Sequence, residues 1–132
     1  MTSVEVLWDN NEKTIMRWEF HHGWTWNDIP IAAKQTHELL KGVDHEVNII
    51  YNTNKTAVPM ENALQNLRFL MQRDASYTGM TVIANATGFA IQLVQIIMKV
   101  FRAREGKLIF AESLEHAREL LSVRAAQAKT NT

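Results

Sequence analysis

The stretch "TIMRWEFHHGWTWNDIPIAAKQTHELL", Thr14 to Leu40, decides the fold class because its apolar residues change period partway along. In its first half every second residue belongs to one mostly apolar set: Met16, Trp18, Phe20, His22, Trp24 and Trp26. This period of two is typical of a strand with one apolar face. In its second half the apolar positions follow helical spacing: Ile29, Ala32, Ala33, Thr36, Leu39 and Leu40. A strand that leads directly into a helix predicts an α/β protein.

Local signals set the limits of this first helix. We expect Asn27 or Asp28 to cap its start, and Pro30 is compatible only with the first turn. Gly42 is expected to end it, because glycine readily adopts the left-handed conformation that follows many helices.

The rest of the chain continues the alternation of strands and helices. We expect further strands at 4–8, 46–51, 78–85 and 107–111, and further helices from 59, over 87–103 and from a Ser113 cap. The predicted order is ββαβαβαβα. This is one α/β domain over residues 1–125, with a mixed, mainly parallel sheet of about five strands and about four helices. The polar tail at 126–132 is expected to fray.

Composition excludes several classes of function. Lys plus Arg and Asp plus Glu are 14 each, so the net charge is zero. This argues against nucleic-acid binding and against a polybasic membrane anchor. The most apolar segment, 89–101, is interrupted by Gln92, Gln95 and Lys99 and is too short to insert into a membrane. The chain has no cysteine, which excludes thiol chemistry. No basic region followed by an apolar run opens the chain, so we expect a cytoplasmic protein.

The adjacent residues His21 and His22 raise the question of a metal site. Neighbouring residues on a strand point to opposite faces, so the pair is poorly arranged to bind one ion. We expect structural or surface histidines and no metal, with His22 partly buried among the tryptophans; a role for His21 and His22 is left open. No serine elbow, phosphate-binding loop, dinucleotide fingerprint or acid–base pair can be found. We therefore expect no enzymatic activity and no cofactor.

The loop "NTNKTAVP", Asn52 to Pro59, is the first candidate site. It follows a predicted parallel strand, and ligands of open α/β sheets bind beyond the carboxyl ends of such strands. The candidate binding residues are Asn52, Thr53, Asn54, Lys55 and Thr56. The helix that is expected to follow would favour anions at its start. The alternative is a plain connecting loop whose polar side chains are solvated.

The predicted helix at 87–103 is the second candidate. It is apolar around more of its circumference than one buried face requires. Ile91, Ile96 and Met98 are the candidate residues for a homodimer face, and packing on a neighbouring helix is the alternative.

The motifs "TGMTVIANATGFAIQLVQIIMKVF" and "KLIFAESLEHARELL" resemble the C-terminal half of a STAS domain, the fold of bacterial anti-sigma-factor antagonists. In the same way "EVNIIYNTNKTAVPMENALQNLRFL" resembles the central strand, switch loop and following helix of that family. The resemblance covers residues 46–123. It implies a STAS-like fold and a regulatory module that binds a protein partner.

The switch loop of the STAS family usually reads "DSSG" and carries a serine that a partner kinase phosphorylates. Here the loop reads "NKTAVP", so the resemblance leaves Thr53 or Thr56 as the candidate phosphoacceptor. A second interpretation is a binder of a small molecule or a lipid-like ligand, since related folds have such roles and the Trp, Met and Phe residues could line a cavity.

Overall fold

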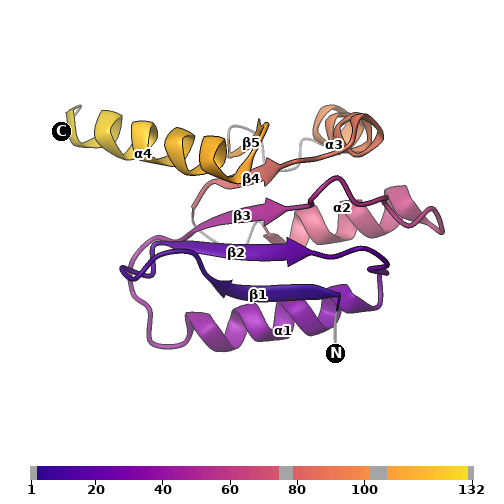
Figure 1. The fold of residues 1–132 in the computed structure, drawn as a ribbon, viewed down its shortest axis with the longest axis horizontal. Coiled ribbons are helices and arrows are strands. Elements are labelled where there is room, and N and C mark those ends of the chain that lie inside the picture. The colour runs from indigo at the N-terminus through magenta and orange to yellow at the C-terminus, as the bar shows by residue number, and fades with distance from the viewer. Residues whose placement is uncertain (1–2, 75–78, 102–106, 131–132) are drawn as a thin grey trace.

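A computed structural model of the chain describes residues 3–74, 79–101 and 107–130 (Figure 1). The strands are β1 (Val4–Trp8), β2 (Ile15–Phe20), β3 (Asn48–Asn52), β4 (Thr81–Ala84) and β5 (Leu108–Ala111). The helices are α1 (Asp28–Leu40), α2 (Ala63–Asp74), α3 (Gly88–Phe101) and α4 (Leu114–Thr130). The predicted α/β class and the order ββαβαβαβα are confirmed.

The five strands form one sheet in the order of the sequence, β1-β2-β3-β4-β5. β1 runs antiparallel to β2, and every later pair is parallel. Each connection between parallel strands therefore leads to the adjacent strand, and always toward β5. Because such crossovers are right-handed, stepping always the same way places the connecting helices α1, α2 and α3 on one face of the sheet.

The face that carries these three helices contains the main core. Its strand residues are the apolar set of the period-two pattern, and Met16, Trp18 and Phe20 are almost fully buried. Trp18 stands edge-on to Tyr51 of the neighbouring strand, with ring centroids 4.9 Å apart. Trp24 stands edge-on to Phe20, with ring centroids 5.0 Å apart. The period-two pattern thus correctly predicted which face of β2 is buried.

The opposite face is covered by α4. Its smaller core contains Ile50, Val82 and Ala84 of the strands together with Ala117 and Leu121 of the helix. α4 follows β5 and connects no two of the described strands, so the handedness rule for crossovers does not apply to it. It contacts β3, β4 and β5, whereas α1 packs beside β1 at the other end of the sheet (Figure 1).

Several local expectations need correction. α2 begins at Ala63 rather than near Pro59, which leaves a longer loop after β3. The Asn27 side chain makes no capping hydrogen bond among the described residues. Instead the carboxylate of Asp28 accepts a hydrogen bond from the Thr25 N–H at 2.8 Å. Gly42 follows the end of α1 with a φ of +80°, as expected. Residues 126–130 continue α4 as helix, beyond the expected domain limit at 125.

The expectation that His22 is partly buried among the tryptophans is wrong. β2 ends at Phe20, and Gly23 then takes a φ of +87°, which turns the chain and interrupts the alternation of faces. His22 is exposed in this turn, while Trp24 returns to the core.

Candidate functional site

The candidate loop lies at the edge of the sheet where the parallel strands end. Three connections meet there: β2 to α1, β3 to α2 and β4 to α3. Parallel strands bring these connections together although they are far apart in the sequence. Of the five predicted residues, Asn52 is the last residue of β3, and Thr53 to Thr56 belong to the middle connection.

Hydrogen bonds join the loop to the connection between β4 and α3. The Thr53 N–H donates to the carbonyl of Ala84 at 3.0 Å, and the Lys55 N–H donates to the carbonyl of Asn85 at 2.8 Å. The Thr53 hydroxyl donates to the Asn85 carbonyl at 2.8 Å. The Lys55 ammonium donates to the carbonyl of Ala86 at 2.9 Å. The loop is therefore not a plain solvated connection.

The loop contains a tight turn with an uncommon backbone. The Thr56 N–H donates to the Thr53 carbonyl at 2.9 Å, and both central residues have positive φ, +52° at Asn54 and +57° at Lys55. Two central residues with positive φ are the arrangement of a type I′ turn. Asparagine tolerates this conformation, but a lysine there costs about 1–2 kcal/mol. Such local strain persists only where the surrounding contacts enforce it.

Two tryptophans from the connection between β2 and α1 hydrogen-bond to the loop through their indole N–H groups. Trp24 donates its indole N–H to the hydroxyl of Thr56 at 2.9 Å, and that hydroxyl donates onward to the Thr53 carbonyl at 2.6 Å. Trp26 donates its indole N–H to the carbonyl of Pro59 at 2.9 Å. A buried indole needs an acceptor, so these bonds align the loop while satisfying the rings.

A polar cluster continues from the loop onto the face of the sheet that carries α4. The Asn52 amide donates to both carboxylate oxygens of Glu19 at 3.0 Å. Asn54 donates to Glu19 Oε2 at 3.0 Å, and Asn85 donates to Asn52 Oδ1 at 2.8 Å. Asn52 and Asn54 were expected as site residues, whereas Glu19 and Asn85 were missed. The signal for Glu19 was its place in the polar set of β2.

Arg17 extends this cluster toward α4. Its guanidinium pairs with Glu19, with Nε 2.7 Å from Oε1, and also donates to the carboxylate of Asp9. Arg118 of α4 donates to the same carboxylate through Nε at 2.9 Å and Nη2 at 2.7 Å. The side chain of Asp9 is only 2% exposed. The hydrogen bonds and charge of Arg118, followed by those of Arg17, lower the pKa of Asp9 although burial opposes this.

The histidines do not gather with these groups. His21 Nε2 lies 2.5 Å from the Glu5 carboxylate, and His45 Nε2 lies 2.8 Å from the carbonyl of Lys13. His116 accepts the N–H of Glu112 at 3.0 Å, close to the Ser113 cap of α4, which was correctly predicted. Among residues 3–74, 79–101 and 107–130, no three side chains of the ligand types are grouped to hold a metal ion.

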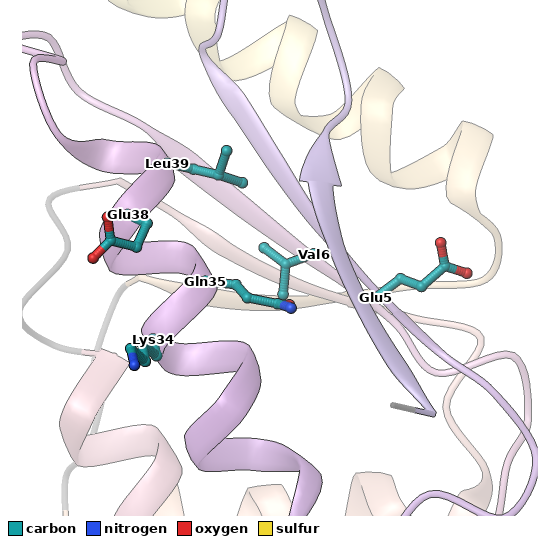
Figure 2. Close-up of a pocket in the computed structure, with 6 residues that line it drawn as sticks. All are labelled: Glu5, Val6, Lys34, Gln35, Glu38 and Leu39. Atoms are coloured by element: carbon teal, nitrogen blue, oxygen red, sulfur yellow. The ribbon is translucent and has the colours of Figure 1, made fainter. Parts of the chain in front are cut away.

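A shallow hollow lies between β1 and α1, but its charged groups do not converge (Figure 2). Val6 and Gln35 lie between the strand and the helix, whereas Glu5 projects from the opposite side of β1. Lys34 and Glu38 lie on the outer side of α1. This hollow provides no paired acid and base for catalysis.

A second hollow is a groove of about 550 Å³ between α2 and α3. Its lining is mostly apolar and includes Met60, Leu64, Phe89 and Leu93. Of the predicted dimer-face residues, Ile96 is exposed, whereas Ile91 and Met98 pack against the main core. In the part of the chain that the structure describes, no helix is long and apolar enough to cross a bilayer.

Compared with models of known families, with curated proteins and with solved structures, the chain finds no match. The resemblance to STAS domains therefore stays a prediction, and the functional argument has to come from the geometry above.

Proposed function

We propose that this protein is a non-enzymatic, STAS-like regulatory module that binds a protein partner through the loop after β3. The surface in question, here called the edge surface, consists of Asn54, Lys55, Ala57 and Met60. The order of elements after residue 46, strand, loop, helix, strand, helix, strand and helix, is the order that the resemblance implies.

The observation that carries the proposal is a rigid loop that ends on an exposed apolar side chain. The backbone and hydroxyls of the loop are bonded to the neighbouring connections, and Val58 packs against the main core. Yet Asn54, Lys55 and Ala57 are exposed, and Met60 is 69% exposed. A surface that is already ordered loses little entropy on binding, and methionine is enriched at protein interfaces.

Phosphorylation of this loop would act by opening it. Thr56 is only 9% exposed, and its hydroxyl bonds both Trp24 and the Thr53 carbonyl. The Thr53 hydroxyl is also bonded, to the carbonyls at the end of β4. A kinase could therefore modify either threonine only after the turn had opened. A phosphate would then keep it open, because its charge and size are incompatible with the buried position.

The second candidate function, a small-molecule or lipid-like ligand, has weaker support. It was motivated by the aromatic residues, which would have lined a cavity. Trp18, Trp24 and Phe20 instead pack against other rings, and the indole groups already have acceptors. Native mass spectrometry of gently purified protein tests this function, and a bound species of constant mass would favour it over the first.

A photo-crosslinking residue in place of Met60 tests the proposed function. We expect it to give one defined adduct with a different protein in cells of the source organism. The same residue in place of Val123, which is 50% exposed on α4, is the matched control and should give none. The purified partner should then bind the protein, and Met60→Asp should weaken this binding at least tenfold.

The proposal fails if Met60 and Val123 give the same adducts, or if the purified partner binds Met60→Asp as well as the unaltered protein. Thr53→Glu and Thr56→Glu test the switch separately. Binding that is indifferent to both would contradict a phosphate-controlled loop while leaving the edge surface in place.

A further inference from the structure

The outward side of α3 carries a row of apolar side chains that the described residues of the monomer leave largely uncovered. We call it the α3 stripe. It consists of Phe89, Leu93, Ile96 and Val100. Phe89, Ile96 and Val100 are 43%, 47% and 63% exposed, and Leu93 is partly buried. Steps of four, three and four residues keep an apolar seam on one side of a helix, as in coiled coils.

We propose that the α3 stripe is a homodimer interface in which the α3 helices of two copies pair antiparallel about a two-fold axis. The steps read the same from either end, four, three, four. Reversing the helix therefore sets Phe89 against Val100 of the partner subunit and Leu93 against Ile96 of the partner subunit. A two-fold interface requires this kind of self-complementarity.

The stripe has a groove beside one end and protruding apolar side chains at the other end, and these two features can contact each other across the two-fold axis. The groove between α2 and α3 lies at the Phe89 end, where Met60 and Leu64 form its other wall. Within the stripe, the two most exposed side chains are Ile96 and Val100, which lie at its other end. In the antiparallel arrangement these two side chains enter the groove of the other copy. The two-fold axis repeats the contact.

The charges on α3 itself do not oppose this pairing, whereas Arg68 of α2 adds a cation to the lining of the groove. The exposed neighbours of the stripe on α3 are Gln92, Gln95 and Lys99, with Lys99 as the charged residue among them. With a rise of 1.5 Å per residue, the two Lys99 side chains would start about 13 Å apart along the axis. This exceeds the Debye length of about 8 Å at physiological salt, so their repulsion is screened. The net charge of zero gives the two copies no long-range repulsion.

Area sets the expected strength of the contact. The 14-residue α3 is about 21 Å long. With helices about 10 Å wide, α2 and α3 together offer a contact surface of roughly 400 Å² on each copy. A stable specific interface buries about 800 Å² on each partner. We therefore expect a weak dimer, with a dissociation constant of about 10–100 µM. The inference does not rest on the proposed function, but the two surfaces share Met60, which lines the groove and belongs to the edge surface. The dimer and the partner protein would therefore compete for this side chain.

Sedimentation equilibrium from about 5 to about 500 µM, a range that brackets the expected dissociation constant, tests the dimer. The mass should rise from 15.2 kDa toward twice that value. Ile96→Glu should keep the protein monomeric throughout, and Val123→Glu, the matched exposed position on α4, should leave the association unchanged. Both side chains are about half exposed, so circular dichroism should report folded variants.

Cysteine crosslinking tests the antiparallel geometry, since the chain has no cysteine of its own. Oxidised Ile96→Cys should form a disulfide-linked homodimer. Phe89→Cys should form none by itself but should crosslink in a mixture with Val100→Cys.

Three results would overturn the inference. One is a monomer at the highest concentration. The second is a dimer that survives Ile96→Glu, which would place the interface elsewhere. The third is efficient crosslinking of Phe89→Cys to itself, which means a parallel pair. The two proposals are separated by placing the Met60 photo-crosslinker in the Ile96→Glu variant, in which the groove is not covered by a second copy. A dimer of the unaltered protein together with no partner adduct in that variant would leave this inference standing and remove only the proposed function.

Discussion

Thr56 shows how much one hydroxyl can contribute when it bonds in two directions. It accepts from the Trp24 indole and donates to the Thr53 carbonyl, and it links the first third of the chain to the loop after β3. Thr53 differs, because the Ala84 and Asn85 carbonyls that accept its hydroxyl also accept backbone N–H groups.

We predict that Thr56→Val lowers the free energy of unfolding by about 1–3 kcal/mol, because it leaves the buried Trp24 N–H without an acceptor. Thr53→Val is the matched control and should cost less than about 1 kcal/mol, since its acceptors keep other donors. Urea unfolding followed by tryptophan fluorescence measures both. Equal losses for the two variants would contradict the role given to the Trp24 bond.

Asp9 is the residue whose contribution should depend on pH. Arg118 and Arg17 hold its pKa below the ordinary value of 3.8. The unfolded chain therefore binds a proton at higher pH than the folded chain does. The stabilisation is fully present above 3.8 and is lost as the pH falls through the lower folded pKa.

We predict that Asp9→Asn lowers the free energy of unfolding by about 1.5–3 kcal/mol at neutral pH, through the loss of charge-assisted hydrogen bonds. The difference from the unaltered protein should shrink as the pH drops from about 5 to 2. Urea titrations across this range measure it. Asp44→Asn, at a fully exposed carboxylate, is the control, and its free energy of unfolding should equal that of the unaltered protein at every pH. A difference in the free energy of unfolding between Asp9→Asn and the unaltered protein that stays constant with pH would contradict the ion-pair argument.

At the scale of elements, Gly79 sets how closely the starts of β3 and β4 approach. A Cβ atom placed there would lie 2.1 Å from the carbonyl oxygen of Val47. That contact is with backbone, so it cannot be relieved by a side-chain rotation. Gly88, the first residue of α3, has no atom within 4 Å of such a Cβ position.

We predict that Gly79→Ala lowers the free energy of unfolding by more than about 2 kcal/mol, since the two strand starts must separate. Gly88→Ala should be neutral or raise it by up to about 1 kcal/mol, because alanine restricts the unfolded chain and suits a helix. Thermal unfolding of the pair compares them. A Gly79→Ala protein as stable as Gly88→Ala would mean that the close approach is absent.

α4 shows why an element's place is harder to predict than its existence. Its inner residues, Leu114, Ala117, Leu120 and Leu121, were readable from helical spacing, and they do pack on the sheet. The spacing says only that a helix has one apolar side. Which face of the sheet α4 covers follows from the apolar residues that β3, β4 and β5 present there.

At the scale of the whole molecule, β3 is the central strand of the sheet, two strands from either edge. It has a parallel neighbour on each side, and its residues contribute to both cores, Tyr51 to the main core and Ile50 to the one under α4. β1, by contrast, is an edge strand that pairs with β2.

We predict that the amides of β3 exchange with solvent last, at a rate set by global unfolding, while those of β1 exchange earlier. Native-state hydrogen exchange read by mass spectrometry or NMR measures the order. If the amides of β1 and β3 exchanged at the same rate, the whole sheet would open in one step, and the prediction of earlier local opening at β1 would be wrong.

The sequence alone determined the fold class, the order of elements and the buried sides of β2, α1 and α4, because periods of two and 3.6 residues are local properties of strands and helices. It also located the loop of Asn52–Thr56, since position after a parallel strand depends only on element order. The tertiary structure decided what those residues contact. Glu19 of β2, Trp24 and Asn85 reach the loop and the end of β3 from positions about 30 residues away in the sequence. His22 was misjudged because one left-handed glycine ended the alternation, and no periodicity reports where a chain turns.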